Sequence, residues 1–173
     1  MQLQFMSDQI LNRVAASSLV TFDLEDHYQE GIREVLDIKP LLEQELILRE
    51  KPFREFIKTH DWSVYTGKHV AVHCSSEAIV PVWAFMLVAT ALEPFARTIV
   101  YGDLEKLEEK LFFNSLAKVD WSAFTGSKVV VKGCSRVRVP ESVFVEVTTR
   151  LKPVVSSLMF GEACSAVPVF KKK

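Results

Sequence analysis

The hydrophobic and polar positions of this chain change period several times, and each change predicts a new element. A β-branched run at residues 68–73 predicts a buried strand, a proline-led apolar stretch at residues 81–94 predicts a helix, and residues 98–101 predict a second strand. The same order of patterns recurs at residues 127–132, 140–153 and 157–160. Each set therefore predicts a βαβ unit, and strands joined through a helix are expected to run parallel.

The two sets align without a gap when Asp61 is placed on Asp120. Residues 61–103 and 120–162 share 16 identities in 43 positions, whereas unrelated sequences of ordinary composition would share about two or three. The shared motifs include Asp-Trp-Ser, Thr-Gly and Val-Pro. We interpret this pattern as an internal duplication, whose two repeats are joined by a helix over residues 103–118.

The segment before the first repeat, residues 1–60, carries weaker patterns. They predict a short helix after Ser7, a strand at residues 19–24, extended segments at residues 37–41 and 45–49, and a helix from Pro52. We expect these elements to join the core of the repeats, so that the whole chain is a single domain. The predicted fold class is α/β, with a mixed, partly parallel sheet built from two duplicated βαβ units and helices packed on it.

Composition and charge exclude several classes of function. With 49% hydrophobic and 25% charged residues, the chain has the profile of an ordinary soluble globular protein. A net charge of −1 gives no general attraction to nucleic acid, and the longest uncharged run, residues 78–92, is too short to cross a bilayer. We expect neither nucleic acid nor membrane as a partner. Three cysteines without an export signal indicate reduced thiols and a cytoplasmic location.

The two predicted crossover helices differ in charge. The helix within residues 81–94 is uncharged between its prolines except at Glu93, whereas its repeat carries Glu141, Glu146 and Arg150. A helix without a polar face needs cover on both sides. Either the N-terminal segment or a second subunit would supply that cover, so a homodimer and a contact with another protein partner are both open alternatives.

Each cysteine follows a strand that is predicted to be parallel, and ligands collect at the carboxyl ends of such strands. Cys74 and Cys134 follow equivalent strands of the two repeats, and Cys164 follows the last parallel strand. We therefore expect the three sulfurs at one edge of one sheet. Together with His73 they are candidate ligands of zinc or an iron–sulfur cluster. Activation of Cys74 or Cys134 as a nucleophile, and ordinary burial of small free cysteines, are the alternatives.

The same loops carry groups that suit a phosphate or carboxylate ligand, namely hydroxyls, cations and the free backbone N–H groups of the helices that follow. The candidate ligand-binding residues are Ser75, Ser76, Lys132, Ser135, Arg136 and Glu162. The alternative is that the serines cap their loops and the cations face water. Because no complete set of nucleophile, base and oxyanion donors is apparent, catalytic residues are not assigned and enzymatic activity is left open.

Specific motifs are spread over the chain, at residues 46–51, 60–63, 74–84, 132–134 and 159–168. Together they resemble a bacterial family catalogued as domain of unknown function 2480, over nearly the whole chain from Ser7. The resemblance implies no established reaction, ligand or catalytic residue. The predicted function is binding of a small ligand or soft metal at the cysteine-bearing edge, as an accessory to iron–sulfur or sulfur handling. The alternative is a non-catalytic interaction or structural module that forms a homodimer.

Overall fold

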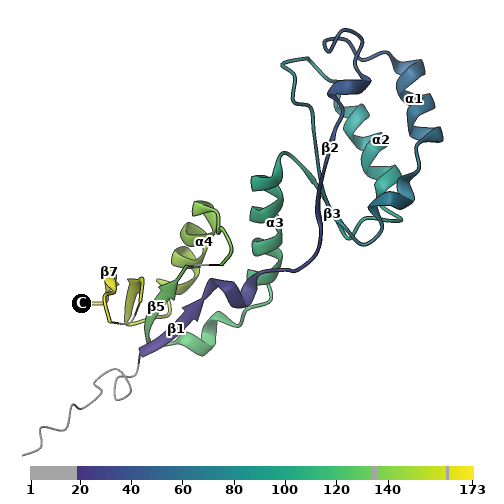
Figure 1. Cartoon of the computed structure of the whole chain (residues 1–173). Helices are drawn as coiled ribbons and strands as arrows, with labels where there is room; N and C mark the ends of the chain where they lie inside the picture. Colours follow the sequence, from purple (N-terminus) through teal and green to yellow (C-terminus); the bar gives the residue numbers. More distant parts are fainter. Residues whose placement is uncertain (1–18, 134–135, 163) are drawn as a thin grey trace, which may run out of the picture. The chain divides into compact units, whose positions relative to one another are not determined.

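The computed structural model describes residues 19–173, except residues 134–135 and 163 (Figure 1). The described chain forms two compact units, each with a sheet of its own. Unit 1 contains the residues up to Asp26, with Asp120–Val137 and Val145–Lys173. Unit 2 contains His27–Val119 and Arg138–Phe144. The short helix predicted after Ser7 lies outside the described residues.

Unit 2 is built on a three-stranded sheet with the order β2-β3-β4, in which all strands are parallel. Its elements are β2 (Arg33–Asp37), α1 (Glu50–Thr59), β3 (His69–His73), α2 (Val82–Leu92), β4 (Thr98–Tyr101) and α3 (Leu104–Leu116). Short 3-10 helices cover Lys39–Leu41 and Trp62–Tyr65. The central strand β3 is buried at its first four residues, as expected of a strand with neighbours on both sides and helices on both faces.

The helices of unit 2 cover the two faces of its sheet. On one face, Val70 and Val72 of β3 pack in a cluster with side chains of α1 and α2, including Phe53 and Val88. On the other face, Ala71 packs with Leu107 and Leu111 of α3. The alternation along β3 therefore divides the core into two layers, one under the helix pair and one under α3.

Unit 1 contains a four-stranded sheet with the order β1-β5-β6-β7. Its strands are β1 (Leu19–Asp23), β5 (Lys128–Lys132), β6 (Ser157–Phe160) and β7 (Val167–Lys171). The first three are parallel, whereas β7 pairs antiparallel with β6 at the edge of the sheet. The helix α4 (Glu141–Leu151) connects β5 to β6, and 3-10 helices cover Leu24–His27 and Trp121–Phe124. Phe22 of β1 stacks on Trp121 with ring centroids 5.4 Å apart.

The two βαβ segments are folded alike. The bounds of β3, α2 and β4 recur in β5, α4 and β6 at the offset that places Asp61 on Asp120. The turns that precede them also match, since Ser63 donates its backbone N–H to Asp61 over 3.0 Å and Ser122 does the same to Asp120 over 3.0 Å. This likeness agrees with a duplication, which remains our interpretation of the sequence identities.

The predicted α/β class, with a mixed, partly parallel sheet and packed helices, is confirmed. Both βαβ units and their parallel strands are present. However, β3 and β5 belong to different sheets rather than to one. The prediction of a single domain remains untested. Among the described residues, no helix combines the length and apolar character needed to cross a membrane.

The prediction of extended segments at residues 37–41 and 45–49 is wrong. The strand lies earlier, at Arg33–Asp37, and ends where the carboxylate of Asp37 accepts the backbone N–H of Lys39 over 2.9 Å and starts a 3-10 turn. The second segment overlaps a tight turn over residues 43–47, in which Gln44 and Glu45 both have positive φ. Charges at both ends of β2 mask its apolar character in the sequence.

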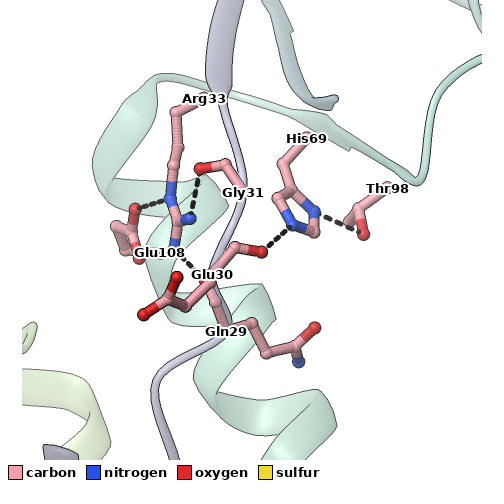
Figure 2. A network of polar contacts seen from close by, with 7 residues as sticks. All are labelled: Gln29, Glu30, Gly31, Arg33, His69, Thr98 and Glu108. Carbon is pink, nitrogen blue, oxygen red and sulfur yellow. Dashed lines mark hydrogen bonds and ion pairs between the residues drawn. The ribbon is translucent and has the colours of Figure 1, made fainter. Parts of the chain in front are cut away.

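A buried histidine connects β3 to two other segments of unit 2 (Figure 2). His69 is 0% exposed. Its Nε2 lies 3.2 Å from the carbonyl oxygen of Glu30, and its Nδ1 lies 3.0 Å from Thr98 Oγ1. Because a carbonyl oxygen can only accept, Nε2 donates to Glu30 and the neutral ring accepts the Thr98 hydroxyl through Nδ1. This bond fixes the start of β4 against β3.

An ion pair and a glycine complete the same network. Arg33 Nε donates to Glu108 of α3 over 2.7 Å, and the guanidinium also donates to the carbonyl oxygens of Gln29 and Gly31 (Figure 2). Gly31 has a φ of +139°, and a Cβ there would lie 2.8 Å from His69 Nε2. Only glycine allows both this backbone conformation and the close approach of the ring.

We expect Gly31→Ala to lower the free energy of unfolding by about 2–4 kcal/mol, because it adds both backbone strain and a clash with His69. The control is Gly67→Ala, since Gly67 has a φ of +71° but open space around it. Gly67→Ala should lower the free energy of unfolding through backbone strain alone, by about 1–2 kcal/mol. Denaturant unfolding of both variants measures the difference, and equal losses would contradict a packing role for Gly31.

We also expect His69 to make the protein less stable in mild acid. Burial lowers the pKa of His69 from its ordinary value of 6.5. Its contribution is complete above pH 6.5 and is lost as the pH falls from there toward the lowered folded-state pKa, because only the unfolded chain takes up the proton. The slope from this group is at most about 1.4 kcal/mol per pH unit.

The measurement is the free energy of unfolding between pH 7 and pH 5 for the natural protein and for His69→Gln, which does not titrate. The variant should be less stable at pH 7, with a flatter dependence on pH. Identical slopes in the two proteins would show that His69 does not carry the proton linkage.

Candidate functional site

The first group of candidate residues lies at the carboxyl end of β3 in unit 2. Ser75 donates both its backbone N–H, over 3.0 Å, and its hydroxyl to the carboxylate of Asp37, at the end of β2. Cys74 Sγ lies 3.3 Å from Ser76 Oγ. His73 is opposite Asp37 in the register of β2 and β3. His73 thus ends β3, and Cys74, Ser75 and Ser76 begin the loop that follows it.

The hydrogen bonds in this loop act on the carboxyl group of Asp37. Burial raises the pKa of Asp37, but hydrogen bonds from the Ser75 hydroxyl and from the backbone N–H groups of Lys39 and Ser75 outweigh it, so the pKa is lowered overall. Sequence reasoning missed this role because it assigned Asp37 to the start of an extended segment. Asp23 shows the same arrangement, since it ends β1 and accepts the backbone N–H of Glu25. The feature that both share in the sequence is an aspartate at the end of a short apolar strand.

The second group lies at the carboxyl ends of β5 and β6 in unit 1. Lys132 Nζ lies 3.6 Å from Asp23 and 3.5 Å from Glu162. The Arg136 guanidinium donates to Glu25 over 2.8 Å. The two cations that were candidate anion ligands are therefore already paired with carboxylates. A bound phosphate would have to compete with these ion pairs.

The candidate metal ligands divide between the two units. Cys74 and Cys164 are free thiols, the first half-buried and the second exposed, and they follow strands of different sheets. The shared sheet edge expected for them is therefore not formed. Cys134 and Ser135 lie outside the described residues. In the part of the chain that the structure describes, no three His, Cys, Asp or Glu side chains gather as a metal site. The assignment of metal ligands remains untested.

Another feature of unit 2 is an exposed apolar surface on α2. A groove of about 440 Å³ is lined by Val80, Val82, Phe85, Met86, Ala89 and Tyr101, which we call the α2 face. Val82 is 73% exposed, Met86 62% and Tyr101 70%. The Phe85 ring packs edge to face on Tyr101 with centroids 4.9 Å apart. Large side chains in such a continuous exposed patch are typical of a surface that binds another molecule.

The helix period explains why this face is exposed. Ala84, Val88 and Leu92 of α2 point into the core and are fully buried. On one flank α1 covers the helix, through an edge-to-face contact between Phe53 and Trp83 with centroids 6.0 Å apart. The sequence predicted cover on both sides. Within the described residues the N-terminal segment covers only one flank, and the α2 face stays in contact with solvent.

The sheet edge next to the α2 face is also open. In the sheet formed by the described residues of unit 2, β4 is the last strand. In unit 1 the equivalent strand β6 is covered by the antiparallel strand β7. An uncovered strand presents backbone N–H and C=O groups that can pair with another chain. The α2 face and the edge of β4 therefore form one continuous surface, joined by Tyr101.

The fold and this surface define an α/β protein with a pair of similar βαβ units, one of which carries an exposed apolar helix beside an open strand. A family profile described as "Protein of unknown function (DUF2480)" matches residues 8–172, so the chain belongs to that family. No curated protein and no solved structure matches the chain. The family resemblance read from the sequence is thereby confirmed, and it assigns no function.

We expect Ser75→Ala to raise the pKa of Asp37 toward its ordinary value and to destabilise the protein by about 1 kcal/mol, because a hydrogen bond to a carboxylate is lost. Carboxyl carbon resonances followed by NMR during a pH titration measure the pKa. Ser76→Ala is the matched control, since its hydroxyl lies beside Cys74 instead. An unchanged Asp37 titration in Ser75→Ala would contradict the assigned contact.

Proposed function

We propose that the protein is a non-catalytic interaction module that forms a homodimer through the α2 face. The observation that carries this proposal is the exposure of Val82, Met86 and Tyr101 on one continuous apolar groove. Ile79, which precedes the helix in the sequence, is also 94% exposed. We keep the cytoplasmic location inferred from the sequence as part of the proposal.

Burial of this face would stabilise an interface substantially. Fully burying a side chain such as Val or Met contributes about 1.5–3 kcal/mol relative to exposure. A two-fold symmetric contact uses the same patch on both copies, so each exposed side chain of the patch is buried once in each copy. The α2 segment from Ala78 to Leu92 carries no charge, so two copies can approach without bringing like charges together.

The second repeat supports the proposal by contrast. Met86 of α2 aligns with Val145 of α4, and the two are 62% and 64% exposed. Around Val145, however, the helix carries Glu141 and a 2.8 Å ion pair between Glu146 and Arg150. The equivalent helices α2 and α4 thus differ in whether they carry charged side chains, and this difference affects association. The charged helix is suited to water, and the uncharged one is suited to a partner.

The ligand or soft-metal hypothesis ranks second. It rests on the thiols of Cys74, Cys134 and Cys164, and on an accessory role in iron–sulfur or sulfur handling. The donors described within unit 2, His73 and Cys74, are too few to complete a structural zinc site, which takes four. Elemental analysis of protein purified without chelator decides the point. One equivalent of zinc or iron, lost in Cys74→Ser, would restore this hypothesis to first place.

We expect Met86→Lys to weaken the homodimer by at least about 30-fold in dissociation constant, because each copy would bury a charge at the centre of an apolar contact. Val145→Lys is the matched control at the equivalent, equally exposed position of the other repeat. It should leave the dissociation constant unchanged. Sedimentation equilibrium over a range of concentrations measures both.

Because both substituted side chains are largely exposed, neither change should unfold the protein, and circular dichroism checks this. A natural protein that stays monomeric at every concentration would overturn the proposed homodimer. Equal weakening by the two substitutions would show that the α2 face is not the contact.

A further inference from the structure

We propose that β4 pairs antiparallel with β4 of a second copy, with Val100 opposite Val100 and Arg97 opposite Asp103. The inference rests on the homodimer proposed above and goes further by specifying its backbone contact and register. The three strands of each unit 2 would then form one continuous sheet of six. Open edge strands are known sites for this kind of strand addition.

The chain itself shows what such an edge accepts. In the second repeat β6 is the equivalent of β4, and its outer edge is paired with the antiparallel strand β7. The backbone of Lys172 extends this pairing by donating to the carbonyl oxygen of Ser156 over 2.9 Å. The edge of β4 has the same strand length and the same preceding turn. An antiparallel strand is therefore the occupant that the geometry of this fold accommodates.

The α2 face limits the register of the pairing. Ile99 packs against the core under α1 and α2, and Tyr101 contacts Phe85 of α2, whereas Val100 packs toward α3. Directly opposed residues of an antiparallel pair point to the same face of the sheet. To bring the α2 faces of both copies to one side, odd-numbered residues must oppose odd-numbered ones and even must oppose even.

Charge selects one register among those that remain. Arg97 directly precedes β4, Asp103 follows it after Gly102, and both are exposed. No ion pair between described side chains includes either of them. With Val100 on the two-fold axis, Arg97 of each copy lies opposite Asp103 of the other, which gives two symmetric ion pairs. Shifting the register by two residues one way places Arg97 opposite Tyr101, and the other way opposite Glu105, which lies in α3 beyond the end of the strand.

The same register also places apolar groups together. Tyr101 of one copy lies opposite Ile99 of the other, on the face that carries α2. Tyr101 is 70% exposed in the single chain, and its ring already rests on Phe85. Pairing would cover it from the open side. One contact would thus pair the strand edge, bury the apolar groove and pair the charges of Arg97 and Asp103.

The first test is a site-specific disulfide in a protein whose natural cysteines, Cys74, Cys134 and Cys164, are replaced by serine. Val100→Cys places two thiols across the two-fold axis, where opposed Cα atoms about 4.5–5.5 Å apart suit a disulfide. Diamide accepts the two electrons and two protons released for each bond. Ile99→Cys is the control, because its two copies would be diagonal neighbours about 7–8 Å apart.

The expected result is a covalent dimer from Val100→Cys and little from Ile99→Cys. The second test is Arg97→Glu, which places like charges opposite Asp103 and should weaken the dimer about tenfold. Adding Asp103→Asn removes the repulsion and keeps the side-chain oxygen that caps α3. The double variant should recover part of the lost affinity.

The outcomes separate this inference from the proposal on which it rests. A natural dimer that depends on Met86, combined with no crosslink at Val100→Cys and unchanged affinity in Arg97→Glu, would overturn the strand pairing alone. A natural protein that is monomeric would overturn both. A crosslink from Ile99→Cys as strong as that from Val100→Cys would contradict the register.

Discussion

An unpaired strand edge beside an apolar helix is the constraint on which our account of this protein depends. The backbone N–H and C=O groups of an open strand edge can pair with another chain in place of water, and apolar side chains gain free energy when they leave water. In unit 1 the edge of β6 is satisfied by β7. In unit 2 the described chain supplies no such strand for β4, and the α2 face beside it stays exposed. In the homodimer that we propose, a second copy would satisfy both needs at once.

The likeness of the two βαβ segments makes this constraint visible. The two βαβ segments share bounds, turn contacts and a parallel strand pair, so each serves as a reference for the other. The differences between the two segments then indicate which surface is suited to a partner. Uncharged side chains replace charged ones on the exposed helix, and the edge strand loses its cover. The His69 network, which fixes the start of β4 through Thr98, holds this edge in place within unit 2.

Much of the fold could be predicted because the two βαβ segments have strong hydrophobic periods and clear breakers. The strands Thr98–Tyr101 and Ser157–Phe160 and the helix capped by Asp103 lie where the patterns placed them. The strand Arg33–Asp37 was missed because its ends are charged and its apolar side chains are few. The division into two sheets was also missed, because periodicity reports which face of a strand is buried and carries no information on which strands are neighbours.

The candidate site was predicted only in part, for a related physical reason. The loops after β3 and β5 carry the serines and cations that the sequence indicated, but ion pairs and the Asp37–Ser75 contact come from side chains distant in sequence. A common edge for the cysteines followed from assuming one sheet, and it fails where that assumption fails. The α2 face, by contrast, was signalled by the absence of charge from residues 78–92, since composition alone shows that a helix lacks a polar side.

The most direct measurement of the central claim is hydrogen exchange at the amides of β4 as the protein concentration is raised through the dimer transition. The amides of β6, which are already paired with β7, provide an internal reference. Our account predicts that exchange slows within Thr98–Tyr101 as dimer forms, while exchange in β6 stays constant. Exchange in β4 that does not change with concentration would contradict it.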